Sequence, residues 1–269
     1  MKKKINMSEF KICIRGGGDI ASGVAWRLYQ CGFRVYITEI DRPMAVRRKV
    51  AFCEAVYDGK AVVEGLEALL VNSPCEIPDV WSRGRIPVII DPLNNSRRET
   101  SPDILIDATI AKRNLGTFID HAPLVIALGP GFAAGRDAHI VIETNRGHNL
   151  GRVLTEGSAE PDTGVPGPIE GVSSDRVLRS PAEGIFKNTM DIGELLKKGD
   201  TVGFVNKIPV KTLIGGALRG LIRPGISVSK GLKLGDVDPR DKTEYCFTIS
   251  EKALAIAGGV LEGILRSFT

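Results

Sequence analysis

The chain has 269 residues, of which 43% are hydrophobic and 25% are charged, an ordinary composition for a globular protein. Its formal net charge of +4 comes without a basic tract that interleaves with aromatic residues, which argues against a nucleic-acid-binding protein. No apolar run reaches the roughly 18 residues of a membrane span, and the basic start of the chain lacks an apolar signal segment. The five cysteines form no Cys-x-x-Cys pair, which indicates reduced thiols. We therefore expect a cytoplasmic protein without a membrane partner or a nucleic-acid partner.

Apolar runs predict a series of strands in the first half of the chain. They lie at 11–15, 34–39, 86–91, 103–108, 123–128 and 139–143, with a weaker run at 61–63. Continuous runs of this kind are typical of strands that are buried on both faces of a parallel sheet. Helical spacing predicts a helix over 20–31, and a second helix is expected from 41 to about 52. This alternation predicts an α/β fold, with a Rossmann-like doubly wound sheet over residues 8–155.

Glycine and proline crowd together at 155–172, which indicates a domain boundary. Short β-like runs follow and predict a small all-β domain over residues 172–240. An apolar segment at 248–269 predicts a C-terminal helix that packs back on the first domain.

The β domain resembles a biotinyl/lipoyl-type barrel-sandwich module. Gly199-Asp200-Thr201-Val202 matches the first half of such a module, and Gly199 and Gly203 recur as Gly231 and Gly235. The resemblance places the modified lysine ten residues after Gly199, where this sequence has Pro209. We therefore expect no biotin or lipoyl group on this chain.

A glycine-rich turn follows the first expected strand. Gly16-Gly17-Gly18-Asp19-Ile20-Ala21 fits the pattern G-x-G-x-x-A between a strand and a helix. Such glycines allow a tight turn and the close approach of a pyrophosphate, which the helix N-terminus attracts. Glu39 ends the next strand, where an acid accepts ribose hydroxyls, and Arg42 follows it. The turn predicts a site for NAD, NADP or another nucleotide. The alternative is a plain turn in which Asp19 caps the helix.

Further candidate residues follow the ends of other expected strands. The backbone of Gly129-Pro130-Gly131 could hold an anion and joins the nucleotide-binding set, although a plain turn is an equal alternative. Four side chains are candidates for catalysis: Cys53, Asp107, Lys112 and His148. A buried structural thiol is the commoner alternative for Cys53. No spacing of histidines or cysteines predicts a metal site.

Taken together, these motifs resemble the YqeB family from about residue 11 to the C-terminal helix. The matching segments are 15–21, 42–48, 53–59, 106–114, 127–132 and 142–148. The resemblance implies an accessory protein of the selenium-dependent molybdenum hydroxylase system. Its partners would be the hydroxylase or the proteins that supply the hydroxylase cofactor. At the level of fold, the first domain is also similar to XdhC-type maturation factors.

Three functions are compatible with these patterns. The leading hypothesis is a maturation factor for a selenium-dependent molybdenum hydroxylase, which binds either NAD(P) or the dinucleotide form of the molybdenum cofactor. The second is an NAD(P)-dependent oxidoreductase, and the third is a non-catalytic scaffold that docks a hydroxylase through the β module. The sequence leaves open whether the chain catalyses a reaction and whether it forms a homo-oligomer.

Overall fold

The computed structural model describes residues 6–268, so the first five residues of the basic start lie outside it. The chain divides into two compact units. Unit 1 contains the described residues up to Pro43, then Ala51–Asp162 and the residues from Ile249 onward, while unit 2 contains Met44–Val50 and Thr163–Thr248. Among the described residues, no helix has the length and apolar character that crossing a membrane requires.

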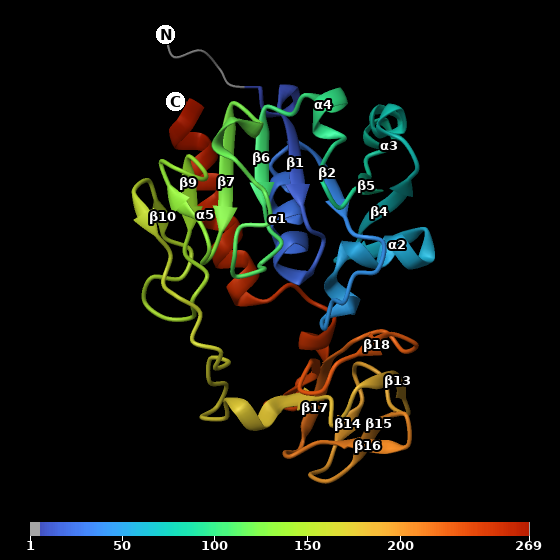
Figure 1. Cartoon of the computed structure of the whole chain (residues 1–269). Helices are drawn as coiled ribbons and strands as arrows, with labels where there is room; N and C mark the ends of the chain where they lie inside the picture. Colours follow the sequence, from blue (N-terminus) through green and yellow to red (C-terminus); the bar gives the residue numbers. More distant parts are fainter. Residues whose placement is uncertain (1–5, 269) are drawn as a thin grey trace. The chain divides into compact units, whose positions relative to one another are not determined.

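Unit 1 is built on a nine-stranded mixed sheet (Figure 1) with the order β10-β9-β7-β6-β1-β2-β5-β4-β3. Its strands are β1 (Lys11–Arg15), β2 (Arg34–Glu39), β3 (Lys60–Val63), β4 (Leu66–Val71), β5 (Ile86–Ile90), β6 (Ile104–Asp107), β7 (Leu124–Leu128), β9 (Ile140–Ile142) and β10 (Val153–Leu154). Seven of them, from β9 to β4 in this order, run parallel to their neighbours. The edge strands β10 and β3 are antiparallel. A separate two-stranded sheet joins β8 (Ala133–Ala134) to β11 (Gly157–Ser158).

The expected strands of the first half are confirmed at β1, β2, β5, β6, β7 and β9, and the weaker run at 61–63 lies in β3. All five residues of β7 and all four of β6 are buried. Such strands need apolar side chains on both faces, which is why their runs are continuous in the sequence.

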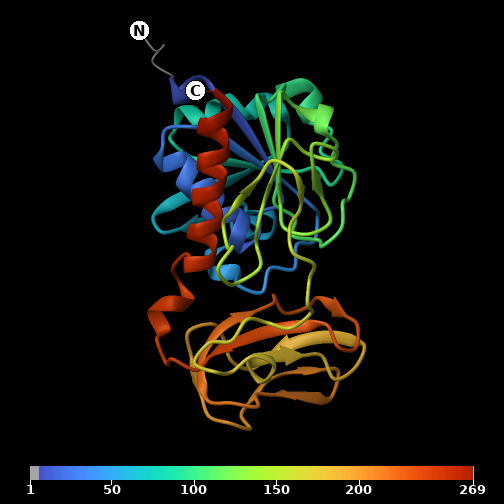
Figure 2. The same cartoon turned by 90° about the vertical axis from the view of Figure 1, so that its left-hand side faces the viewer.

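The α-helices of unit 1 are α1 (Asp19–Gln30), α2 (Ala55–Asp58), α3 (Ile77–Ser82), α4 (Arg97–Thr100) and α5 (Glu251–Phe268). Helices α1 and α5 pack against each other behind the sheet in Figure 1, and Figure 2 shows the full length of α5. Gly23 of α1 allows this close approach, because a Cβ atom there would lie 2.7 Å from Cβ of Ala253. Short 3-10 helices complete the chain: η1 (Met7–Glu9), η2 (Arg48–Val50), η3 (Phe52–Glu54), η4 (Pro74–Glu76), η5 (Ile119–His121), η6 (Ser174–Arg176) and η7 (Thr243–Cys246).

The expected helix from 41 to about 52 is wrong. This stretch forms turns and the short helices η2 and η3, and residues Met44–Val50 belong to unit 2. Val46 packs so closely on Gly220 that a Cβ atom on that glycine would lie 2.8 Å from Val46 Cγ1. The Arg48 Nε donates to the carbonyl of Leu221 at 3.0 Å. These tertiary contacts override the local helical pattern.

The expectation of a Rossmann-like doubly wound sheet followed by a barrel-sandwich module also needs correction. The sheet is mixed, and its connections from β6 to β7 and from β7 to β9 contain no α-helix. A doubly wound sheet carries helices in these crossovers. Unit 1 is therefore an α/β domain with a mixed sheet.

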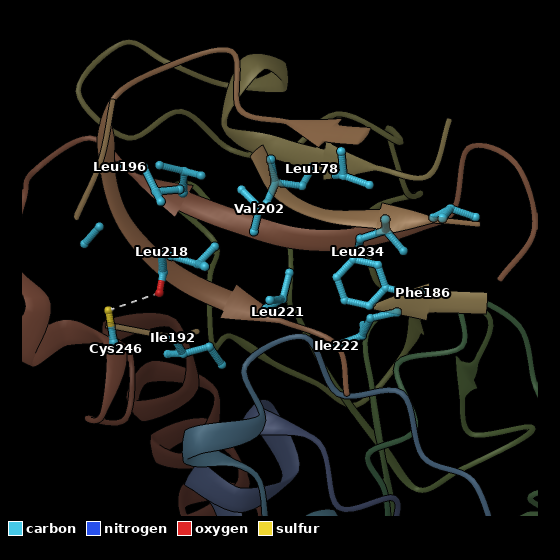
Figure 3. Packing of buried hydrophobic residues seen from close by; sticks show 14 of the residues in the cluster. Leu178, Phe186, Ile192, Leu196, Val202, Leu218, Leu221, Ile222, Leu234 and Cys246 are labelled. Carbon is cyan, nitrogen blue, oxygen red and sulfur yellow. Dashed lines mark hydrogen bonds between the residues drawn. The ribbon is translucent and has the colours of Figure 1, made fainter. Parts of the chain in front are cut away.

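Unit 2 consists of two four-stranded antiparallel sheets, β12-β19-β17-β14 and β16-β15-β13-β18. The strands are β12 (Val177–Arg179), β13 (Gly184–Asn188), β14 (Leu195–Leu196), β15 (Thr201–Val205), β16 (Ile208–Lys211), β17 (Gly216–Leu221), β18 (Ser227–Val228) and β19 (Lys233–Asp238). Side chains from both sheets share one hydrophobic core, in which Phe186 faces Leu221 and Leu234 (Figure 3). At its edge, the Cys246 thiol donates to the carbonyl of Leu218.

The hairpin between β15 and β16 does not have Pro209 at its tip. Its two-residue tip is Asn206-Lys207, with Val205 paired to Ile208. Pro209 instead lies within β16, opposite Phe204. A proline that cannot donate a ladder hydrogen bond is tolerated there because β16 is an edge strand.

Candidate functional site

The strand–turn–helix–strand arrangement expected at residues 11–39 is confirmed. β1 ends at Arg15, and Gly16 turns the chain with φ of +93° before α1 begins at Asp19. The Gly16 N–H donates to the carbonyl of Thr38 at 2.8 Å, and a Cβ atom at Gly16 would lie 3.1 Å from the Ala108 carbonyl oxygen. The turn is therefore held between the ends of β2 and β6, and only glycine fits its first position.

The next two glycines have different surroundings. A Cβ atom on Gly17 would meet the backbone nitrogen of Cys53 at 3.0 Å, and the Cys53 N–H donates to the Gly17 carbonyl at 2.9 Å. A Cβ atom on Gly18 would meet no described heavy atom within 4 Å. Gly18 is the N-cap residue of α1 and supplies no side-chain cap. Gly17 is thus a packing position, whereas Gly18 faces open space at the start of the helix.

Glu39 is tied to this turn through both of its carboxylate oxygens. Oε2 accepts from the Gly17 N–H and Oε1 accepts from the Ile40 N–H, each at 2.7 Å. Burial raises the pKa of the Glu39 carboxyl, and the two backbone hydrogen bonds work in the opposite direction. The end of β2 therefore places a fixed, half-buried carboxyl group directly beside the glycine turn.

An apolar surface lies next to Glu39, which the sequence patterns did not single out. The Asp91 N–H donates to the Glu39 carbonyl at 2.8 Å, so the loops after β2 and β5 start side by side. Ile40 is 42% exposed in the first of these loops, and Leu93 is 73% exposed in the second. The exposure of a large apolar side chain is a property of the folded chain, so the sequence offers no signal that separates these two residues from the buried apolar residues of β2 and β5.

Cys53 lacks the environment of a reactive thiol. The residue is buried, and burial raises the pKa of its thiol well above the usual value. The negative charges of Glu39, Glu54 and Asp19 raise that pKa further. A thiolate needs nearby positive charge and solvent access. The structure thus favours the structural alternative for this cysteine over chemistry with sulfur or selenium.

We expect a thiol reagent at pH 8 to label Cys75 in the folded protein and to leave Cys53 unmodified. Cys75 is exposed, whereas Cys53 reacts only after unfolding because its thiol stays protonated and buried. Mass spectrometry of peptides from native and urea-unfolded samples measures both sites. Equal labelling of the two cysteines in the folded protein would show that Cys53 is activated after all.

Arg15 and Asp107 form a buried network beneath the site. Asp107 is fully buried, and its carboxylate accepts hydrogen bonds from Thr117 at 2.6 Å and from Thr109 at 2.7 Å, with Arg15 at 3.4 Å. The Arg15 guanidinium also donates to the carbonyl of Leu115 at 2.9 Å. These bonds join the end of β1 to the loop after β6. The geometry gives Asp107 the role of fixing that loop rather than of contacting a ligand.

The loop after β6 has a strained backbone. Ile110 has φ of +53° and Lys112 has φ of +63°, a conformation that a β-branched residue such as isoleucine rarely adopts. The Lys112 ammonium group donates to Asp162 at 2.7 Å. A Cβ atom on Gly131 would lie 2.5 Å from Cα of Arg113, so the loop after β7 supports this segment from one side.

The remaining candidates lie apart from the glycine turn or serve packing. Gly129 lies against Thr144, and a Cβ atom there would approach its Oγ1 to 2.4 Å. His148 and Arg42 are exposed. Arg47 donates to the carbonyls of Tyr245 and Thr248 inside unit 2, each at 2.8 Å. Among the described residues, no group of three or more histidine, cysteine or acidic side chains could hold a metal ion. The geometry therefore brings together the turn, Glu39 and Cys53.

The sequence of the chain was compared with those of known proteins. No family model matches the chain. Its sequence is 48% identical over 254 residues to the uncharacterized protein YqeB of Escherichia coli (strain K12). The chain is similar to YqeB. The match covers 94% of this chain and 47% of that protein, so the chain spans about half the length of this relative. The expected resemblance to YqeB is supported, but an association with a selenium-dependent molybdenum hydroxylase is not shown.

Solved structures give weaker similarities. TcdA (CsdL) matches with a TM-score of 0.34 and 14% identity, over 97% of this chain and 88% of that one. An aspartoacylase family protein from Mesorhizobium loti matches with a TM-score of 0.28 and 12% identity, over 84% of each chain. The ectoine utilization protein EutE (DoeB) from Ruegeria pomeroyi, with bound product, gives 0.25 and 13%, over 84% of this chain and 56% of that one. Similarities at this level transfer no activity to the chain.

These comparisons correct the expected function. Several structural neighbours are named as aspartoacylase- or succinylglutamate desuccinylase-type proteins. These names differ from the expected maturation factor and from the expected NAD(P)-dependent oxidoreductase. The assignments to a molybdenum hydroxylase maturation factor, to an NAD(P)-dependent oxidoreductase and to a hydroxylase-docking scaffold are therefore withdrawn. The burial and the raised pKa of the Cys53 thiol also argue against the catalytic role for which this cysteine was a candidate.

Proposed function

We propose that unit 1 binds a nucleotide at the carboxyl ends of β1, β2 and β5. The observation that carries this proposal is the fixed Glu39 carboxylate beside the glycine turn. A carboxylate offers about four lone-pair positions. The N–H groups of Gly17 and Ile40 occupy two of them, which leaves acceptor capacity for the hydroxyl groups of a ribose.

The surroundings of Glu39 suit the other two parts of a nucleotide. The exposed side chains of Ile40 and Leu93 offer apolar surface for the flat base. On the opposite side, Gly18 opens the N-terminus of α1, whose dipole favours a phosphate. β1 also lies where the order of the sheet reverses, between β2 and β6, and α/β sheets commonly bind ligands at such a point.

Negative charge around the turn sets a condition on the phosphate. Asp19 is the first residue of α1, and the Glu39 carboxylate accepts from the Gly17 N–H, so two acidic residues lie at the start of the helix. They oppose a bare phosphate group. Magnesium ions bind phosphates together with one or two carboxylates, so we expect the nucleotide to bind as its magnesium complex.

Two neighbouring glycines test the proposal. Gly18→Ala introduces a methyl group into open space, so we expect the free energy of unfolding to change by less than about 1 kcal/mol. The same methyl group obstructs the approach of a phosphate, so we expect binding of ADP with magnesium to weaken by about tenfold or more. Isothermal titration calorimetry on the full chain measures this change.

The controls separate binding from folding. Gly258→Ala also adds a methyl group in open space, within α5, and should leave ADP binding unchanged. Gly17→Ala should instead lower stability, because its methyl group collides with Cys53. The proposal fails if the wild-type chain shows no saturable binding of ADP with magnesium, or if Gly18→Ala binds it as tightly as the wild type.

A further inference from the structure

A cavity of about 440 Å³ lies at the opposite end of the sheet strands from the glycine turn. It is bounded by the first residues of β7 and β9 and by the C-terminal end of α5, all at the same end of unit 1 in Figure 1. This volume falls in the range of about 300 to 1,000 Å³ that is usual for small-molecule sites. The nucleotide-binding site proposed at the glycine turn does not include this cavity.

One part of the cavity wall is apolar. Leu124 and Ile140, which are 4% and 6% exposed, line it from the two strands. Phe268 lines it from α5, and its ring packs on that of Phe10 at 4.6 Å between centroids. The aromatic wall therefore has support from a second ring. These surfaces suit the hydrocarbon body of a ligand.

Polar side chains line the other part: His139 before β9, Thr155 after β10, and Arg266 and Ser267 in α5. The Ser267 hydroxyl already donates to the Gly263 carbonyl at 2.8 Å, whereas the other three side chains can act as donors. The Nδ1 of His139 accepts from the Val125 N–H at 3.0 Å, so the neutral ring carries its proton on Nε2. Thr155 contributes a hydroxyl group, and Arg266 contributes a guanidinium group. Among the described residues that line the cavity, none is acidic. The Arg266 guanidinium also pairs with Glu262 at 3.2 Å on the exposed face of α5, and it has further N–H donors that this one contact does not use. Donors of this kind around one cavity suit an anion.

We propose that this cavity binds a small organic carboxylate with an apolar body. The ligand's carboxylate would accept from Arg266, Thr155 and His139, and its body would pack against Leu124, Ile140 and Phe268. The combination of apolar side chains and several donors around one cavity separates this site from a plain surface charge. The inference is independent of nucleotide binding, because the two sites lie at opposite ends of the strands.

Benzoate is a suitable probe, with benzyl alcohol as the uncharged molecule of the same ring and size. We expect saturable binding of benzoate to the full chain, measured by ligand-observed NMR. Benzyl alcohol should bind at least about tenfold more weakly. Arg266→Gln should weaken benzoate binding by about tenfold because it removes the positive charge. Thr155→Val, which replaces one hydroxyl by a methyl group, should weaken it severalfold.

Arg83→Gln is the matched control. Arg83, the C-cap residue of α3, forms an exposed pair with Asp79 four residues before it, as Arg266 does with Glu262 in α5. Both changes remove an exposed helical ion pair of small energetic value, so a general effect on stability would appear in both variants. Benzoate binding should be unchanged in Arg83→Gln. The proposal is overturned if benzoate shows no saturation up to about 10 mM, if benzyl alcohol binds equally well, or if Arg266→Gln binds benzoate like the wild type.

Discussion

Gly259→Ala is expected to lower the free energy of unfolding of unit 1 by about 3 kcal/mol. A Cβ atom at this position would lie 2.1 Å from the carbonyl oxygen of Gly151 and 3.1 Å from Cγ2 of Ile142. The first of these atoms belongs to the backbone, so it cannot rotate away as a flexible side chain could. To accept the methyl group, α5 must move away from the loop between β9 and β10, and packing along the helix is lost.

Gly258→Ala should have the opposite effect. A Cβ atom there meets no described heavy atom within 4 Å, so alanine gains helix propensity of about 0.5 to 1 kcal/mol without a clash. Both variants gain the same propensity in the same helix, so the difference between them measures the contact with Gly151. Trp26 and Trp81 are the two tryptophans of the chain and both lie in unit 1. Their fluorescence in urea therefore reports the unfolding of this unit, and equal midpoints for the two variants would refute the predicted contact.

Asp238→Asn is expected to destabilise unit 2 by about 3 kcal/mol. Asp238 is fully buried in β19, and its carboxylate pairs with Arg240 at 2.6 Å and with Arg219 at 3.3 Å. The Arg219 side chain is itself 6% exposed. Removing the negative charge leaves a buried guanidinium without its counter-ion, which costs far more than the loss of a surface ion pair.

Cysteine labelling can measure this change without interference from unit 1. Cys246 is buried and is the single cysteine of unit 2, since the other four lie in unit 1. Asp238→Asn should speed the labelling of Cys246 under native conditions, because the unit opens more often. Asp175→Asn, which changes an exposed aspartate of the same unit, should leave the rate unchanged. Equal rates in both variants would contradict the assigned role of Asp238.

The same group also predicts how the stability of unit 2 depends on pH. Burial alone would raise the pKa of Asp238, but hydrogen bonds from Arg240 and the charges of Arg240 and Arg219 lower it overall. A carboxyl group with a lowered pKa stabilises the folded state above its unfolded pKa of about 3.9, and this contribution is lost as the pH falls through the folded pKa. Below about pH 4, amide hydrogen exchange of unit 2, corrected for the intrinsic exchange rate, should therefore rise more steeply in the wild type than in Asp238→Asn.

The elements predicted from sequence were those with a local signal. The buried strands were found because both of their faces need apolar side chains, and the turn at Gly16 was found because a positive φ requires glycine. The helix expected over 41–52 failed, because Val46 and Arg48 pack into unit 2 and such contacts leave no periodic trace. The expected doubly wound sheet was also wrong. The segments between β6 and β7 and between β7 and β9 form loops, where a doubly wound sheet has helices.

The residues of the candidate site were found from the sequence, but their roles were decided by the tertiary structure. Glu39 was found from its place at the end of a strand, and the structure ties it to Gly17. Asp107 and Cys53 were also found near strand or helix ends, but burial turns the first into an anchor for Arg15 and leaves the second unreactive. A residue type and its position along the chain indicate which chemistry is available. They do not indicate which neighbours already use that chemistry.

The sequence by itself determined six of the seven parallel strands, the glycine turn between β1 and α1, and the terminal helix α5, because each has a pattern in residues that are close in the chain. It did not determine β4, the seventh parallel strand. Only the tertiary structure decided that Gly17 is a packing position and Gly18 an open one, since Cys53 meets the first and no described atom meets the second. It also decided that the C-terminal end of α5 closes a cavity with β7 and β9. These distinctions arise from residues far apart in the chain, whose contacts form only when the sheet and its helices have assembled.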